Sequence, residues 1–543
     1  MNYRYVCRVV GLFLLAYSPT MLIPLAVGYC VGEPFGVEPF DTVWGFCAAA
    51  SVTIAMAFVL LGASLGSKTE FFHKEGILSV AAVWYLVVVC SALPFVFTGT
   101  ADFASATFES ASGLTTTGAS VFGAKGLPAI EDLPASLLFW RAQLHWIGGL
   151  GIIVMFLVLL PMTGATQKRL FFGEVPGISK DTLRPRMTRT VALLFRIYLL
   201  LTIAITTGFL VFGMNLFEAV CHAFATIATG GFSTRNLSIG AFHSLGIEMV
   251  CLIGMLMSGT SFALYFSAFE VLTRRDEHGT EAQLTVWGKV RRAIHVFWTD
   301  REFRLYVTIW MVVTSLITIT LVIHGPGIPE PPGEVHDYTN VGEALRSASF
   351  SVGSLSTSTG FGTRDYLGWP FLAHALLILI MLHGGCTGST SGGLKVARFL
   401  VVLKLVSRGF RRFLRPRRVE KPLQLGDDNY LDAEGLEEIV TFSAVWFITW
   451  LLGGLAILFL SEVDVLTAFS SVLSCMGNIG PGVTEVLPHT LTPLNDAGVN
   501  VGPYGSYGAF TGAPKLLFAF IMVAGRLEIY AAIAVFAPSF WKD

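Results

Sequence analysis

The chain has 543 residues, of which 53% are hydrophobic and only 13% are charged, and its formal net charge is −1. Soluble domains carry about 25% charged residues, so this composition excludes an ordinary soluble enzyme, and the near-zero charge provides no basic field for nucleic acid. Long apolar runs, which membrane barrels lack, instead predict an all-α polytopic membrane protein. The eight cysteines stand alone, without C-x-x-C pairs, so we expect neither a disulfide framework nor a zinc site.

Ten apolar runs are long enough to cross a bilayer, which takes about 20 residues in a helix. The first run lies at the N-terminus, but it is too long for a signal peptide and no A-x-A cleavage site follows it, so we interpret it as a membrane helix. In chain order the runs lie near 8–31, 43–65, 76–99, 136–161, 190–213, 242–270, 303–324, 371–406, 438–461 and 514–538.

Four shorter apolar stretches cannot span a membrane, and they lie at 103–117, 216–229, 342–359 and 464–479. Each lies between two spanning runs and ends in Thr/Gly or Asn/Gly residues. Irregular backbone at membrane depth is tolerated only where protein covers it or water reaches it. We therefore expect four re-entrant hairpins, in each of which a short helix enters and a loop returns to the same side.

The helix–re-entrant loop–helix unit recurs four times, which predicts four pseudo-fourfold repeats around a central pore and an accessory N-terminal two-helix hairpin. Alignment of the loops on Gly118, Gly230, Gly360 and Gly480 places these glycines 112, 130 and 120 residues apart. The expected divisions are the accessory hairpin at 1–66, the repeats at 67–165, 166–275, 276–408 and 437–543, and a basic cytoplasmic linker at 409–436.

The charged connections indicate the orientation of the chain. The stretches 167–189 and 407–421 are rich in Lys and Arg, whereas 32–41 and 325–343 hold acidic residues and no basic ones. Because basic connections stay on the cytoplasmic side, we expect both termini to be cytoplasmic and all four re-entrant loops to enter from outside.

Four glycine-centred loops that meet on one axis would surround it with backbone carbonyls. Such oxygens can replace the hydration shell of a monovalent cation without a fixed charge that would trap it, and glycine permits the φ values that turn successive carbonyls inward. For any single loop, the alternative is a plain Gly/Thr turn between helices. The expected filter residues are Thr116, Thr117, Gly118, Ala228, Thr229, Gly230, Ser358, Thr359, Gly360, Asn478, Ile479 and Gly480, flanked by Ala119, Gly231, Phe361 and Pro481.

Arg526 lies in the last run, thirteen residues after Ala513. At 1.5 Å per residue it is about 20 Å from the outer end of that helix. Because intramembrane charges usually face a cavity, we expect Arg526 to act as an electrostatic barrier in the pore. Pairing with a buried carboxylate such as Glu528 is the alternative.

The run at 371–406 is interrupted by HGGCTGSTSGGLK, whose residues are poor helix formers. We expect the span to break in mid-membrane, where unwound backbone can gate a pore; a kinked structural helix is the alternative. The pattern is not a phosphate-binding P-loop, because Leu394 precedes Lys395. The expected gating-loop residues are Gly384, Gly385, Gly388, Gly392, Gly393 and Lys395.

Other polar residues are open to two interpretations. Glu109 and Glu218, in the short helices, either anchor the loops through hydrogen bonds or face an outer vestibule. His145 and Trp146 are expected to mark a membrane interface. The basic linker either anchors the chain on the cytoplasmic side or docks a cytosolic partner.

The chain resembles TrkH-type subunits of the Trk/Ktr/HKT potassium transporter superfamily over essentially its whole length. The resemblance is carried by the four loops and by HWIGGLGIIV at 145–154, GEVPGISKDTLRPR at 173–186, GGCTGSTSGGLK at 384–395 and GRLEIYAA at 525–532. It implies a homodimeric potassium-uptake protein of the bacterial inner membrane, with a gating loop at 384–393 and a pore-facing Arg526.

The resemblance also implies selectivity and partners. In that family, glycine at all four filter positions accompanies potassium preference, and serine at the first accompanies sodium preference, so Gly118 keeps the potassium pattern. The fourth loop departs from Thr-x-Gly and reads Asn478-Ile479-Gly480. Family members work with cytosolic RCK-type, TrkA-like subunits that bind adenine nucleotides or NAD(H). We therefore expect regulation in trans, with potassium as the substrate and no cofactor in this chain.

Potassium uptake down the electrochemical gradient is thus the expected function. Two alternatives remain open: the ion-conducting subunit of an ATP-driven potassium pump, and a sodium-preferring relative. An intramembrane enzyme would need paired carboxylates, an H-E-x-x-H motif or a Ser/His pair at membrane depth. The sequence contains none of these, so we do not expect an enzyme.

Overall fold

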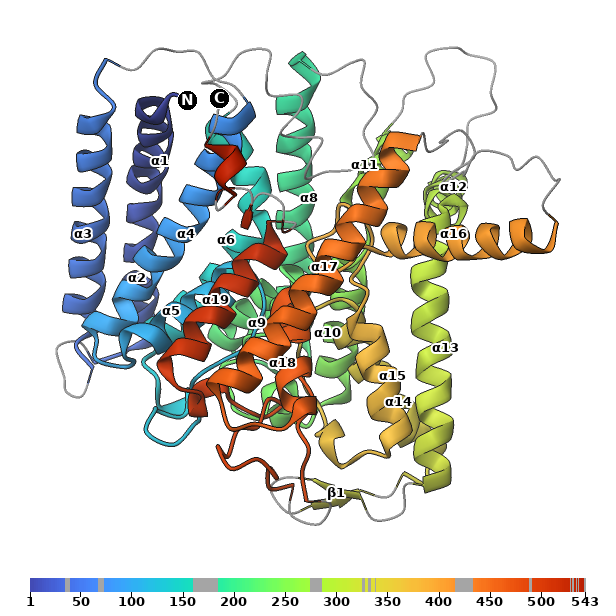
Figure 1. Cartoon of the computed structure of the whole chain (residues 1–543). Helices are drawn as coiled ribbons and strands as arrows, with labels where there is room; N and C mark the ends of the chain where they lie inside the picture. Colours follow the sequence, from blue (N-terminus) through green and yellow to red (C-terminus); the bar gives the residue numbers. More distant parts are fainter. Residues whose placement is uncertain are drawn as a thin grey trace.

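The computed structural model of the chain is almost entirely helical, and its two termini lie near each other at one end of the molecule (Figure 1). Its described residues are 1–34, 40–66, 73–159, 184–273, 286–324, 328–330, 334–336, 338–415, 433–487, 491–527, 529, 532–533, 535 and 537–541. Residues 167–183 of the first basic stretch, residues 416–432, which make up most of the predicted linker, and Glu528 therefore lie outside the described residues. Within those residues the only strands are β1 (Ile328–Glu330) and β2 (Glu334–His336), which pair antiparallel.

The N-terminal part forms the expected accessory hairpin. The first run divides into α1 (Tyr3–Tyr17), the 3₁₀ turn η1 (Ser18–Leu22) and α2 (Ile23–Val31), because Pro19 at the start of η1 has no N–H to continue the α1 hydrogen-bond ladder. The second run is α3 (Thr42–Ala63), which packs along α1 (Figure 1).

The rest of the chain alternates long helices with short ones. The long first helices are α4 (His73–Phe97), α8 (Arg184–Val211), α13 (Arg301–His324) and α17 (Ala433–Leu460). The short helices are α5 (Phe103–Leu114), α9 (Leu216–Ile227), α14 (Val341–Ser356) and α18 (Val465–Gly477). The helices that follow them are α6 (Ala135–Leu159), α10 (Leu245–Ser258) with α11 (Phe262–Thr273), α15 (Phe371–Met381) with α16 (Val396–Leu414), and α19 (Gly512–Arg526). The remaining elements are α12 (Val286–Thr299) and the 3₁₀ turns Ile130–Asp132, Ser238–Phe242, Tyr366–Gly368, Tyr507–Ala509 and Pro538–Phe540.

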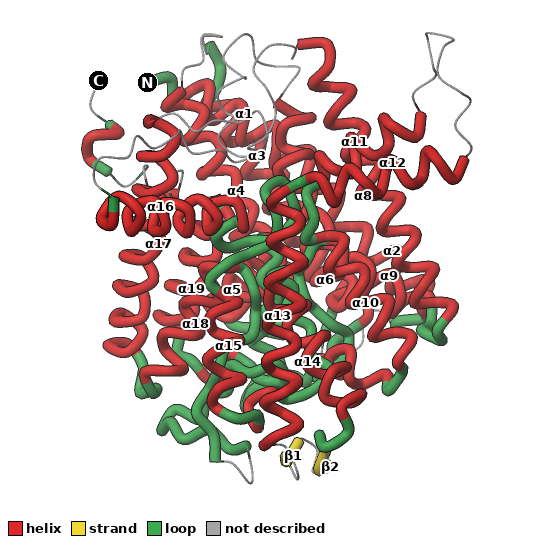
Figure 2. Tube along the Cα trace, turned by 90° about the vertical axis from the view of Figure 1, so that its right-hand side faces the viewer, coloured by secondary structure: helices red, strands yellow, loops and turns green. Residues whose placement is uncertain are grey.

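The four short helices lie where the sequence predicts them. Each begins with a side-chain cap, in which Asp102, Asn215, Asn340 or Asp464 accepts hydrogen bonds from the first turn. At 12 to 16 residues, or roughly 18–24 Å, they are too short to cross a hydrocarbon core of about 30 Å. They therefore end inside the molecule, and the loops that follow run through its middle, as Figure 2 shows.

Besides the first run, two predicted spans contain breaks that the sequence did not predict. The run at 242–270 bends by 92° between α10 and α11, and α19, the helix of the last run, ends at Arg526. Among the described residues, six helices are long and apolar enough to cross a membrane, or seven if the bent pair is one span. The breaks coincide with close packing between helices: at Gly525, for example, a Cβ would overlap the Met476 carbonyl at the end of α18. The second helices thus come so close to the short helices that glycine is needed, and glycine weakens a helix.

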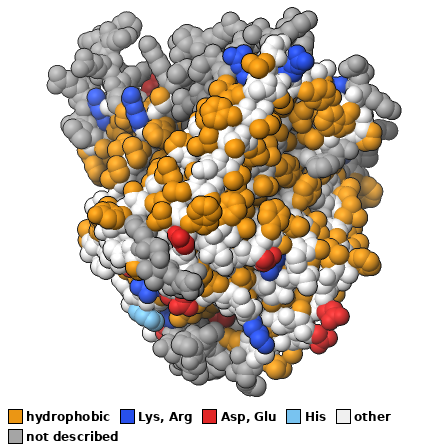
Figure 3. Space-filling model, turned by 90° about the vertical axis from the view of Figure 1, so that its left-hand side faces the viewer, with side chains coloured by type: hydrophobic (Ala, Val, Ile, Leu, Met, Phe, Trp, Pro, Cys, Tyr) orange, Lys and Arg blue, Asp and Glu red, His pale blue; other side chains and the backbone are white. Residues whose placement is uncertain are grey.

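The predicted break in the run at 371–406 is present, since α15 ends at Met381 and α16 begins at Val396. Beyond the break, α16 lies nearly perpendicular to α13 (Figure 1). The outer surface of the protein is apolar over a broad belt, with most charged side chains toward its two ends on the face drawn in Figure 3. This is the surface that a membrane-spanning bundle presents to lipid.

Candidate functional site: a ring of four re-entrant loops

All four loops fold into the same turn. The first loop residue after each short helix or its cap is left-handed: φ is 57° at Thr116, 53° at Thr229, 54° at Ser358 and 52° at Asn478. The N–H of the next residue donates back into the short helix, from Thr117 to Ser112 O, Gly230 to Ala225 O, Thr359 to Ser354 O and Ile479 to Ser474 O, at 2.8–2.9 Å. A glycine with φ of 80–101° follows in each loop. One backbone conformation is therefore repeated four times.

This conformation corrects the register of the second loop. The glycine equivalent to Gly118, Gly360 and Gly480 is Gly231, with φ 81°, and not the predicted Gly230. The segment of that loop equivalent to Thr116-Thr117-Gly118 is accordingly Thr229-Gly230-Gly231, whereas Ala228 is the cap residue of α9. The sequence alignment of this loop was wrong because two glycines are adjacent. Matching the Thr-Gly pair in the sequence selects Gly230 instead of Gly231.

The four loops close into a ring. A Cβ built on Gly118 would overlap the carbonyl oxygen of Gly230. A Cβ on Gly231 would overlap the Thr359 carbonyl oxygen, and a Cβ on Gly360 would overlap the Ile479 carbonyl oxygen. A Cβ on Gly480 would lie 2.6 Å from the Thr117 carbonyl oxygen. Each loop thus contacts the next in cyclic order, and the fourth contacts the first. Only glycine fits at these positions, both because of the positive φ and because a neighbouring carbonyl occupies the space of a side chain.

The carbonyls inside this ring have no hydrogen-bond donors. Among the described residues, none donates to the backbone oxygens of Thr117, Gly230, Thr359 and Ile479, although these residues are buried. Buried carbonyls without a partner are rare in folded proteins, so four of them at the junctions of one ring form a candidate site for a cation. The described residues contain no cluster of His, Cys, Asp or Glu that could hold a metal ion, so the backbone supplies the oxygens here.

The segment between α15 and α16 lies directly against the base of this ring. The N–H of Gly392 donates to Ser358 Oγ at 2.8 Å, and Thr390 Oγ1 donates to the Ile227 carbonyl at 3.1 Å. A Cβ on Gly392 would overlap the carbonyl of Gly477. The predicted gating-loop residues Gly384, Gly385, Gly388, Gly392 and Gly393 all lie in this segment, and Lys395 Nζ donates to the Ser391 carbonyl at 2.7 Å.

Arg526 links the segment between α15 and α16 to helix α6. Its Nη1 donates to the Thr390 carbonyl at 2.6 Å and its Nη2 to the Gly148 carbonyl of α6 at 3.1 Å. The guanidinium therefore lies beneath the ring and in contact with the interrupted segment.

Comparison with known proteins identifies the family. The model of the TrkH family, described as a cation transport protein, matches residues 45–542.

The chain belongs to the TrkH family.

Three relatives illustrate how close the similarity is. The Trk system potassium uptake protein TrkH of Escherichia coli strain K12 is 32% identical over 546 residues, and that of Halomonas elongata is 32% identical over 550 residues; both alignments cover 100% of each chain. The crystal structure of the potassium transporter TrkH from Vibrio parahaemolyticus matches with a TM-score of 0.79 at 29% identity, again over 100% of both chains. The family and the apolar helices together make this chain a membrane protein.

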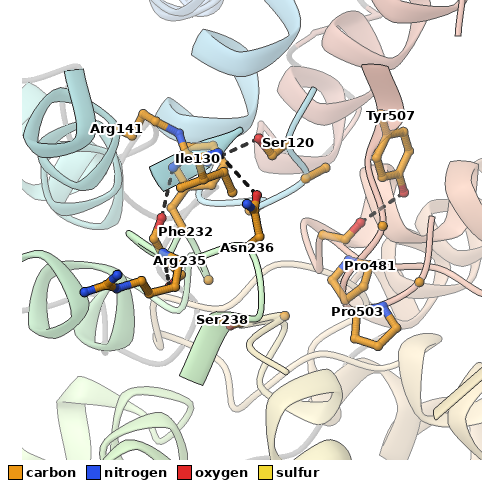
Figure 4. A pocket seen from close by; sticks show the side chains of 18 residues that line it. Ser120, Ile130, Arg141, Phe232, Arg235, Asn236, Ser238, Pro481, Pro503 and Tyr507 are labelled. Carbon is orange, nitrogen blue, oxygen red and sulfur yellow. Dashed lines mark hydrogen bonds between the residues drawn. The ribbon is translucent and has the colours of Figure 1, made fainter. Parts of the chain in front are cut away.

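In this TrkH-family chain, a buried ion pair supports the ring from behind. Glu109 accepts from Arg141 Nε at 2.8 Å and from the N–H of Val121 at 2.9 Å, and both side chains of the pair are almost fully buried. Arg141 also donates to the Ser233 carbonyl, and its guanidinium lies 4.1 Å from the centre of the Phe232 ring. Glu109 therefore anchors the first loop. Arg141 joins the first loop to the second, and Figure 4 shows it beside Ser120 and Phe232.

Glu218 also has an anchoring contact, because it pairs with Arg235 at 2.6 Å just after the second loop. The side chain of Arg235 is 46% exposed, so this pair lies at the surface of the outer hollow. That hollow lies beside the ring and is lined by its four glycines, by Arg141 and by Tyr507 (Figure 4).

His145 is not the interface marker that the sequence predicts. It is fully buried, its Nδ1 donates to the Gly113 carbonyl at 2.8 Å, and its Nε2 accepts from the N–H of Phe232 at 3.1 Å. The imidazole thus fixes the second loop to the end of α5. The error arose because a His-Trp pair in an apolar run is common both at membrane surfaces and in polar contacts inside a protein.

Sequence reasoning missed Arg141, Tyr507 and Glu302. Arg141 carried a usable signal, because it is an isolated charge in an apolar run, as Arg526 is. Glu302, at the start of α13, accepts hydrogen bonds from the N–H groups of Thr387 and Ala397 at 2.6 and 3.0 Å and so joins the segment between α15 and α16 to the first turn of α16. Neither Glu302 nor Tyr507 lies in a recognisable motif.

Proposed function

We propose that this chain conducts potassium ions through the axis of the four-loop ring. The observation that carries the proposal is the set of buried, unbonded carbonyls of Thr117, Gly230, Thr359 and Ile479. Neutral oxygens can replace the water around a potassium ion without trapping it. The short helices also direct their C-terminal ends, which carry partial negative charge, toward the loops.

Potassium is the ion we infer, rather than sodium, on two grounds. All four loops present a glycine at the equivalent position once the second loop is aligned on Gly231, and in the family this pattern accompanies potassium preference. The relatives from Escherichia coli, Halomonas elongata and Vibrio parahaemolyticus are named as potassium uptake proteins or potassium transporters. The division into four repeats around one pore is part of the same proposal.

We infer that the segment at 384–395 is the gate and that Arg526 is an electrostatic barrier beneath the filter. The hydrogen bonds of Thr390 and Gly392 to the base of the ring support a closed position in this structure. The contact between Arg526 and the Thr390 carbonyl supports a second role, in which the guanidinium holds the gate in place. Opening then requires these bonds to break together.

The assembly is inferred from the family. We propose a homodimer in the bacterial inner membrane with both termini cytoplasmic, regulated by a cytosolic RCK-type, TrkA-like subunit that binds the nucleotide. The exposed arginines Arg411, Arg412 and Arg415 at the C-terminal end of α16 support the cytoplasmic assignment of that face, because basic residues stay on the cytoplasmic side.

Transport needs no ATP chemistry in this chain. A membrane potential supplies about 2.3 kcal/mol per charge per 100 mV, which corresponds to an accumulation of roughly 50-fold. We therefore propose a transporter, and neither an enzyme nor the subunit of an ATP-driven pump.

The test is rubidium uptake into liposomes that contain the purified protein and carry an imposed inside-negative potential. We expect rubidium and potassium to enter without ATP and to stop near the ratio set by the potential, about 50-fold at 100 mV. Absence of flux for every monovalent cation would contradict the proposal. Accumulation well beyond that ratio would show that a second ion drives the transport.

A further inference from the structure

The four junctions of the ring are not equivalent. A Cβ on Gly480 would lie 2.6 Å from the Thr117 carbonyl oxygen, whereas the corresponding distances between Cβ and carbonyl oxygen at the other three junctions are shorter. Gly480 also has a φ of 101°, compared with 80–83° at the other three glycines. The junction between the fourth loop and the first is therefore the most open of the four.

Two side chains bridge this open junction. Below the ring, Asn478 Nδ2 donates to Thr117 Oγ1 and to the Met522 carbonyl, both at 3.0 Å. Above it, the hydroxyl of Tyr507 donates to the Gly480 carbonyl at 3.0 Å, and the N–H of Tyr507 donates to the Ser120 carbonyl at 2.9 Å. Tyr507 is 2% exposed, and Figure 4 shows its hydroxyl directed at the backbone beside Pro481.

This hydroxyl makes one outer carbonyl different from the others. Among the described residues, none donates to the backbone oxygens of Gly118, Gly231 and Gly360, whereas Gly480 has Tyr507 as its donor. A carbonyl that accepts an O–H bond is held in one direction by it. At the open junction, where the neighbouring loop leaves the most room, such a restraint limits how far the carbonyl can move toward the axis.

We propose that Tyr507 is a positioning residue for ion selectivity, which rests on the proposed potassium function. Sodium is smaller than potassium, so oxygens must close in further to coordinate it after dehydration. The hydrogen bond from Tyr507 restrains the Gly480 carbonyl from moving toward the axis, at the junction where the loops are least tightly packed. Removal of the hydroxyl releases this carbonyl, and sodium is then coordinated better than before.

The chain offers a matched control in Tyr366. This tyrosine is also 2% exposed, and its hydroxyl donates to the Gly482 carbonyl of the same loop at 2.8 Å. Gly482 lies two residues beyond the ring. Tyr366→Phe therefore removes an equivalent buried hydroxyl bond from the fourth loop without freeing a ring carbonyl.

The experiment compares wild type, Tyr507→Phe and Tyr366→Phe in liposomes, with the ratio of potassium to sodium flux as the readout. A second readout is the difference in stabilisation that potassium and sodium give to each detergent-solubilised protein against heat, which requires no flux. We expect Tyr507→Phe to lower the flux ratio several-fold, and to reduce the difference in stabilisation, while Tyr366→Phe keeps both near wild type. Unchanged values in Tyr507→Phe, or equal losses in both variants, would overturn the proposal. Wild type that conducts no potassium would instead refute the proposed function itself.

Discussion

At the scale of single residues, the ring glycines are the most constrained positions in the molecule. Gly118 and Gly231 each combine a positive φ with a carbonyl oxygen of the next loop in the place of a Cβ. We expect Gly118→Ser and Gly231→Ser to push the loops apart and to lower the ratio of potassium to sodium flux about tenfold, or about 1.4 kcal/mol of discrimination.

Gly126→Ser is the control for this prediction. Gly126 has a φ of 89° but no atom within 4 Å of its added Cβ, so the substitution carries the backbone strain without touching the ring. Equal selectivity in all three variants and wild type would show that the ring does not select the ion. An effect of Gly118→Ser without any effect of Gly231→Ser would reject the corrected register.

The buried pair of Glu109 and Arg141 gives a second prediction at this scale. Arg141→Met leaves the Glu109 carboxylate buried without its cation, so we expect a loss of about 3–5 kcal/mol in the free energy of unfolding. The double variant Glu109→Gln/Arg141→Met removes both charges and should recover part of that loss. Thermal unfolding of the solubilised proteins measures both effects.

The outer pair of Glu218 and Arg235 is the control. Because Arg235 is 46% exposed, Arg235→Met should cost about 1 kcal/mol or less. A loss as large as that of Arg141→Met would show that burial does not set the strength of these pairs.

At the scale of elements, the proposed gate is held by contacts between segments that lie far apart in the sequence. Arg526 of α19 donates to Thr390 in the segment between α15 and α16. We expect Arg526→Ala to release that segment and to raise the rate of rubidium uptake several-fold, and Arg526→Lys, which keeps the charge but not the two-pronged contact, to have a smaller effect. Uptake at the wild-type rate in Arg526→Ala would assign the arginine a purely structural role.

The elements themselves were largely predictable, whereas their contacts were not. Short apolar stretches between long ones can only be re-entrant helices, and polar caps such as Asp102 and Asn215 fix where they begin. Glycine-rich breaks predicted the interruption at 382–395, but the bend at 259–261 and the end of α19 depend on close packing against neighbouring helices. The roles of Tyr507 and His145 were invisible for the same reason, because their partners Gly480, Ser120, Gly113 and Phe232 lie tens to hundreds of residues away in the sequence.

At the scale of the whole molecule, the ring is held in a buried core, and the charged side chains inside it are bound to partners, as in the pair of Glu109 and Arg141. Every short helix ends in the middle of the bundle, where the loops meet in cyclic order. The central claim is that the carbonyls of Thr117, Gly230, Thr359 and Ile479 coordinate the permeating ion on the axis between them.

The most direct test is an anomalous-scattering map of crystals grown or soaked in rubidium, compared with crystals in sodium. In the rubidium crystals we predict a peak on the axis between these four carbonyl oxygens. We predict no comparable rubidium peak at the protein surface. A map with no rubidium within the ring, from protein that conducts rubidium in liposomes, would contradict the claim.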